Sequence, residues 1–214
     1  MEAWKRVGRL LQRNSEELLA YLDGIALEGD PVDGEKERSE VERLLLNFAS
    51  AASARVDHSR NAFDKESPDF QERYAPLKDT LGESTEHLLA WGIRNYILHV
   101  GLPPLNWVGY LEVRPPLGLV TVLDFHVDRE ALRRVDFFKG GSKKKALDAQ
   151  EPMIRLAPLV KAYAEAAKAL DAEVVELFEQ LHAEELDEDF AMWREVQAAW
   201  KEAGLGAWVG ATED

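Results

Sequence analysis

The chain contains no cysteine, which excludes disulfide bridges and thiolate metal sites. It also lacks any apolar run long enough to span a bilayer, and the segment from Met1 to Arg6 has no hydrophobic stretch typical of a signal peptide. Its 214 residues, 46% hydrophobic and 31% charged, are enough for one globular domain with a sizeable core. These features predict a cytoplasmic protein with no membrane segment.

Positive charge is scarce, because 26 lysines and arginines stand against 40 acidic residues and give a net charge of -14. An acidic surface repels polyanions, which argues against broad, non-specific nucleic-acid binding. One segment is an exception, since basic residues surround Phe137 and Phe138 there: Arg129, Arg133, Arg134, Lys139, Lys143, Lys144 and Lys145. Such a mixture can hold a phosphate backbone and stack a base, so the four lysines are candidate RNA-binding residues. The alternative is a solvated loop whose two phenylalanines lie in the core.

Apolar residues recur at helical spacing along most of the chain, which predicts an all-α fold, a helical bundle. We expect a single domain over residues 1–204 and a flexible tail over 205–214. Asp187 is the expected N-cap of the last helix. The expected helices cover about 4–27, 36–63, 85–99, 152–184 and 187–200, with a short helix or ordered connection over 68–81.

The helical pattern is interrupted at about 105–127. Two β-branched and aromatic stretches flank the turn-rich sequence Arg114-Pro115-Pro116-Leu117-Gly118, which is typical of a β-hairpin. We therefore expect a hairpin inserted directly after the helix at 85–99. It could border a site, supply a dimerisation edge or act as a plain structural flap.

The sequence RNYILH, from Arg94 to His99, is the strongest functional signal in the chain. Asn95 and His99 are four residues apart and so lie on one helix face, with Arg94 beside them. Gly101 and the prolines after it end the helix, which leaves His99 in the last turn. The negative end of the helix dipole there favours imidazolium and makes the ring a better proton donor.

This motif resembles that of the HEPN superfamily (higher eukaryotes and prokaryotes nucleotide-binding domain). In both, an arginine and a polar residue are followed by a histidine, within a helix of a small helical domain. The resemblance covers these six residues and their helical context. It implies a homodimer in which two motif helices form a composite, metal-independent endoribonuclease site. Arg94 would then stabilise the phosphate, His99 would transfer protons and Asn95 would orient the scissile group. Family toxins controlled by tyrosine modification have a tyrosine two residues after the histidine, where this chain has Gly101.

The leading hypothesis is therefore an endoribonuclease that transfers the ribose 2′-OH to the adjacent phosphate without metal or cofactor. Its expected partners are RNA, a second copy of the chain and an antitoxin or regulatory protein, in a toxin-antitoxin or phage-defence setting. The competing hypothesis is a non-catalytic HEPN-like module for nucleotide or RNA binding or for assembly. A third reading is a metal site built from histidines on different elements: His58, His87, His99 and the Asp124/His126 pair.

Overall fold

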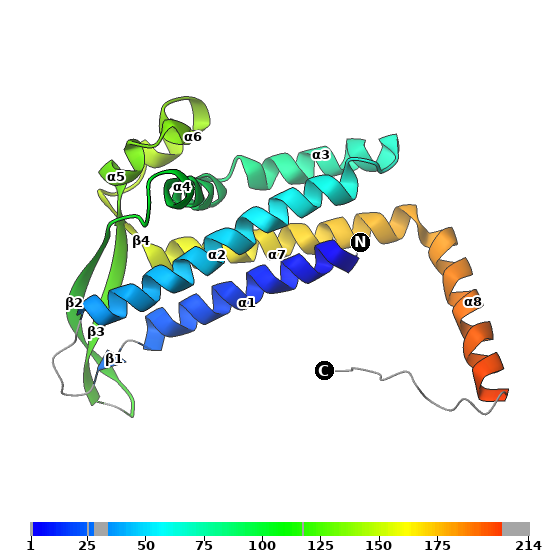
Figure 1. Ribbon diagram of the computed structural model, residues 1–214, viewed down its shortest axis with the longest axis horizontal. Helices are drawn as coiled ribbons and strands as arrows, with labels where there is room; N and C mark the ends of the chain where they lie inside the picture. The colour runs from blue at the N-terminus through cyan, green and yellow to red at the C-terminus, as the bar shows by residue number, and fades with distance from the viewer. Residues whose placement is uncertain (1, 25, 28–33, 117, 203–214) are drawn as a thin grey trace.

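The computed structural model describes residues 2–24, 26–27, 34–116 and 118–202. Helices dominate, and a small antiparallel sheet lies at one end of them (Figure 1). In chain order the elements are α1 (Glu2–Gly24), β1 (Ala26–Leu27), α2 (Gly34–Phe63), α3 (Pro68–Gly82), α4 (Thr85–His99), β2 (Leu105–Arg114), β3 (Gly118–Asp128), α5 (Arg129–Arg133), the 3-10 helix η1 (Asp136–Phe138), α6 (Gly141–Asp148), β4 (Met153–Arg155), α7 (Leu156–Leu181) and α8 (Ala183–Glu202).

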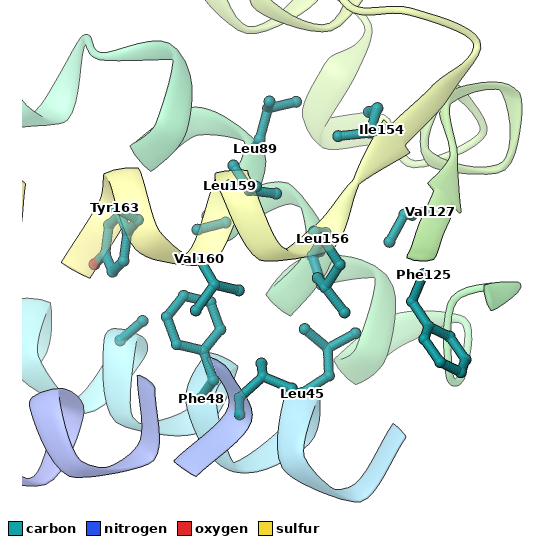
Figure 2. Packing of buried hydrophobic residues seen from close by; sticks show 14 of the residues in the cluster. Leu45, Phe48, Leu89, Phe125, Val127, Ile154, Leu156, Leu159, Val160 and Tyr163 are labelled. Atoms are coloured by element: carbon teal, nitrogen blue, oxygen red, sulfur yellow. The ribbon is translucent and has the colours of Figure 1, made fainter. Parts of the chain in front are cut away.

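The long helices α1, α2 and α7 run side by side and form the body of the bundle (Figure 1). Its main core joins α2, α4 and α7, where Phe48 and Tyr163 meet edge to face with ring centroids 5.7 Å apart. Leu45, Leu156 and Val160 continue this core toward the sheet (Figure 2). Leu89 and Ile93 of α4 are buried in the same core, and complete burial of such side chains is worth about 1.5–3 kcal/mol each, so α4 is fixed in the bundle.

A second, mostly aromatic cluster closes the far end of the bundle, where α3 packs against α7. Phe63 is at its centre, with Trp4 edge-on at 5.2 Å and Phe70 at 5.2 Å between ring centroids. The helix α8 follows α7 and turns away from the bundle (Figure 1). No helix in the described ranges is both long and apolar enough to cross a membrane.

The sheet is built on β3, which pairs with β2 on one side and with β1 and β4 on the other, all antiparallel. Phe125 and Val127 of β3 are buried in the main core (Figure 2). The far half of the hairpin extends beyond the helices, so Leu111 and Val113 of β2 are 67% and 70% exposed.

The predicted helical bundle with a hairpin after the motif helix is confirmed as a mostly helical fold, and two short strands that were not expected extend the hairpin into a small sheet. The first helix ends at Gly24 and not at Leu27, because Ala26 and Leu27 pair with β3 as β1. The helix expected from 152 begins only at Leu156, since Met153–Arg155 forms β4.

Two further expectations are corrected. Asp187 is not an N-cap, because α8 already begins at Ala183. The basic segment is not a loop: it folds as α5, η1 and α6, with Phe138 buried. The tail expected over 205–214 is outside the described residues.

Candidate functional site

The motif helix α4 has clear start and stop signals. The Ser84 hydroxyl accepts a hydrogen bond from the His87 backbone N–H at 3.2 Å and caps the first turn. At the other end, the backbone N–H groups of Val100 and Gly101 both donate to the Tyr96 carbonyl. Gly101 has a φ of 137°, which disfavours other residues, so the chain leaves the helix directly after His99. The predicted position of His99 in the last turn is confirmed.

Arg94 is half-buried on the side of α4 that faces α2. Its guanidinium carbon lies 5.1 Å from the ring centroid of Trp91, a cation–π contact one turn back along the helix. Arg94 lines a groove of about 270 Å³ between α2 and α4, which we call the α2–α4 groove. Asp57 of α2 lines the same groove and forms an ion pair with Arg60, with Oδ1 and Nη1 3.7 Å apart.

Asn95 is also half-buried, and its side chain is used locally. The amide Nδ2 donates one of its two N–H groups to the Trp91 backbone carbonyl at 2.8 Å, which leaves the second N–H and the amide oxygen for other partners. This bond fixes the Asn95 amide against its own helix, and an orienting role can use either remaining group.

His99 is exposed at the end of α4, and it makes no hydrogen bond or ion pair with any described residue. It is flanked by apolar side chains that are also exposed: Leu98 at 56%, Val100 at 59% and Leu102 at 47%. Contiguous apolar side chains on a surface mark an interaction site. The imidazole therefore sits in a surface suited to a partner.

Arg94 and His99 do not converge within one chain. They are five residues apart, so their side chains leave α4 about 140° apart and about 7.5 Å apart along its axis. His99 is instead seven residues from Gly92 and shares its face, which packs on η1. The contact at Gly92 is very close, since a Cβ there would lie 1.9 Å from Phe138 Cζ.

The basic segment is next to α4 on this second face (Figure 1). Lys139 is neutralised by a close ion pair with Asp136. Lys143 places its ammonium 4.3 Å from the Phe137 ring centroid. Lys144 and Lys145 are exposed on α6, with no ion pair to a described residue. Three of the four candidate lysines thus keep a charge available to an anion.

The metal reading has no geometric basis in the described ranges, where no group of three or more His, Asp or Glu side chains is placed to hold a metal ion. His126 and Asp124 do meet, with Nε2 and Oδ2 3.6 Å apart, and Arg155 Nε donates to the same carboxylate oxygen at 2.7 Å. This cluster ties β3 to β4 and does not include His99.

A buried ion pair in the bundle was not predicted from the sequence. Arg55 is only 3% exposed and forms an ion pair with Asp171 across the bundle. Near it, burial lowers the pKa of His87 to about 4, and the positive charge of Arg55 adds to this shift. The signal that marks this group is a charged residue in the apolar stripe of α2.

No model of a known protein family, no curated protein and no solved structure matches this chain. The functional interpretation therefore depends on the residues and geometry described above.

Proposed function

We propose that the protein is a metal-independent endoribonuclease of HEPN type that works as a homodimer in the cytoplasm. The observation that carries the proposal is the position of His99, exposed at the C-terminal end of α4 and surrounded by exposed Leu98, Val100 and Leu102. A second copy covering this apolar surface brings two His99 side chains into one cleft.

The reaction requires three functions. A base removes the proton of the ribose 2′-OH, and this oxygen attacks the adjacent phosphorus. An acid protonates the leaving 5′ oxygen, and the products are a 2′,3′-cyclic phosphate and a free 5′-OH. In the proposed site one His99 is the base and the partner copy's His99 is the acid, while Arg94 balances the charge on the phosphorane.

The divergence of Arg94 and His99 around α4 favours a site shared between two copies. Since the two side chains leave the helix about 140° apart, one chain cannot direct both at one phosphate without a change in α4. In a dimer, Arg94 of one copy can approach His99 of the other. The exposed charges of Lys143, Lys144 and Lys145 then extend the RNA path on the face of α4 that carries His99.

The first test replaces His99 and Arg94 by alanine. Both variants should lose cleavage of a mixed-sequence RNA. His99→Ala should keep its thermal stability, because exposed positions usually contribute within about 0.5 kcal/mol. Arg94→Ala, at a half-buried position, should lose only its contact with Trp91, worth about 0.5–1 kcal/mol. Arg94→Lys should also fail, since an ammonium cannot make the bidentate phosphate contact. His58→Ala, a histidine of α2 outside the α2–α4 groove, is the matched control and should cleave normally.

A mixing experiment tests the shared site directly. When wild-type protein and His99→Ala are mixed in equal amounts and allowed to exchange, about a quarter of the dimers carry two His99 side chains. Activity per total protein should then fall to about a quarter of the wild-type value if both histidines are needed, and to about half if each copy acts alone. A result near half contradicts the composite mechanism.

The chemistry can be tested without a variant. Because imidazole and guanidinium supply all the catalytic groups, cleavage should persist in EDTA. It should also stop when the ribose at the cut site carries a 2′-methoxy group. Activity that is lost in EDTA and restored by a divalent cation contradicts the proposal.

A non-catalytic HEPN-like binding or assembly module is the second candidate. Two observations favour it: the Asn95 amide is bonded to its own helix, and Asp57 shares the groove of Arg94. In that case RNA or a nucleotide binds, and neither the wild type nor His99→Ala cleaves RNA. An antitoxin or regulatory protein is a partner we propose for either candidate, in a toxin-antitoxin or defence setting.

A further inference from the structure

A cavity of about 300 Å³ lies where the first turn of α4 meets α2, α3 and α7. We call it the Arg55 cavity. Its polar lining includes Arg55 and Ser59 from α2, Tyr74 and Lys78 from α3 and His87 from α4. The volume is at the lower end of the range of small-molecule pockets, in which polar groups that converge on one space fix the orientation of a ligand.

Arg55 is held by one edge of its guanidinium. Nε donates to Asp171 Oδ1 at 3.0 Å, and Nη2 donates to the same oxygen and to the Ala167 carbonyl. Nη1 carries two N–H groups and makes no hydrogen bond to any residue in the described ranges. A guanidinium that is 3% exposed and fixed in position therefore presents an unused donor at the cavity.

His87 contributes a second unused group. Its Nδ1 is buried and has no hydrogen-bond partner among the described residues. The ring is held near Trp91 and Tyr163, with centroid distances of 5.8 and 5.9 Å. Buried polar atoms without a partner are uncommon in folded proteins, and a bound molecule is one way to satisfy them.

Charges at the cavity limit what can bind. Arg60 and Lys78 line it together with Asp79 and Glu83, so the cations and the acids around the opening nearly balance. A polyanion such as RNA gains little there, because the acids repel it as strongly as the cations attract it. A compact ligand with one oxyanion group meets less repulsion, because it carries less charge, and it gains the Nη1 hydrogen bonds of Arg55.

We propose that the Arg55 cavity binds a small molecule with one oxyanion group, a carboxylate or a phosphate, which accepts hydrogen bonds from Arg55 Nη1. His87 bonds a second polar atom of this molecule. The site is separate from the Arg94 and His99 motif, and it does not depend on ribonuclease activity.

The test titrates the full chain at pH 7 with sodium phosphate and, separately, with sodium benzoate, at constant ionic strength with sodium chloride as reference. The imidazole signals of His87 are followed by NMR, and heats of binding are measured by calorimetry. At least one probe should give saturable shifts of His87 that chloride does not give. Saturation by phosphate alone identifies a phosphate ligand, and saturation by benzoate alone identifies a carboxylate ligand.

Three variants test whether the bound anion contacts Arg55. Arg55→Lys removes Nη1 and should weaken binding by about tenfold or more, whereas Lys168→Ala, on the exposed side of α7, should leave it unchanged. If Arg55→Lys does not fold, Lys78→Ala at the rim should still weaken binding by about threefold. The proposal is overturned if neither probe saturates, if chloride gives the same shifts, or if folded Arg55→Lys or Lys78→Ala binds as the wild type does.

Discussion

Acidification from pH 7 to pH 5 should destabilise this protein through one side chain, His87. Burial, together with the nearby charge of Arg55, lowers the pKa of His87 in the folded protein from its ordinary value of 6.5 to about 4. Between these two values the unfolded chain binds a proton that the folded chain does not. Stability is therefore complete above pH 6.5 and is lost progressively as the pH falls toward 4.

The size of the effect follows from proton linkage. With pKa values of 6.5 and about 4, the free energy of unfolding should fall by about 2 kcal/mol at pH 5 and by about 3 kcal/mol at pH 4. Asp171 acts in the opposite direction, because burial raises its pKa against the opposing effect of Arg55, and its protonation on acidification stabilises the folded state.

Urea unfolding at pH 7, 6 and 5 measures this directly. In His87→Gln the fall between pH 7 and pH 5 should shrink to a few tenths of a kcal/mol, even if the variant is less stable at pH 7. His182 provides a control of opposite sign. Its pKa is raised, first by the hydrogen bond to Glu185, so it stabilises the fold at low pH, and His182→Gln should steepen the fall. A wild-type curve that is flat from pH 7 to pH 5, or a His87→Gln curve as steep as the wild type, refutes the reasoning.

Three further predictions concern packing, the buried ion pair and RNA binding. Gly92→Ala should destabilise the protein by about 1–3 kcal/mol in urea, because the new Cβ would overlap Phe138; an unchanged or higher stability contradicts that close contact. Arg55→Met should cost about 3–5 kcal/mol by leaving Asp171 without its cation, and adding Asp171→Leu should recover much of this loss; a single variant as stable as the wild type argues against the ion pair. Lys144→Ala should reduce the dependence of log affinity for single-stranded RNA on log salt by about 0.7, and an unchanged slope excludes this lysine from the RNA path.

The bounds of a helix could be predicted from the sequence where its apolar spacing, its N-cap and its stop signal agree. Regular apolar spacing, a serine cap and the Gly101 stop define α4, and its end at His99 could be predicted without a structure. The strands β1 and β4 could not be predicted, because two or three residues are too few to show an alternating pattern. They are strands only because they pair with β3, at Ala26 with Val122 and at Ile154 with Val127.

The geometry around Arg94, Asn95 and His99 could be predicted only in part from the sequence. Asn95 and His99 share a helix face as expected, since a spacing of four residues fixes that relation. That Arg94 faces α2 while His99 faces away depends on how α4 is rotated in the bundle, and tertiary packing sets this rotation. The ion pair of Arg55 joins residues 116 positions apart, so only its unusual place in an apolar stripe could be read from the sequence.

The acidic composition is compatible with the proposed function if RNA binds only to the dimer, because ion pairs neutralise several of the basic side chains in each copy. Arg133 is paired with Glu130 and Asp148, and Lys139 is paired with Asp136, so much of the basic segment carries little net charge. One copy then has few charges for a phosphate backbone, and RNA affinity should be low for a monomer. Two copies double those charges and bring two histidines together. Under the proposed function, RNA binding and catalysis therefore both depend on dimerisation, and the acidic remainder of the surface limits binding outside the shared cleft.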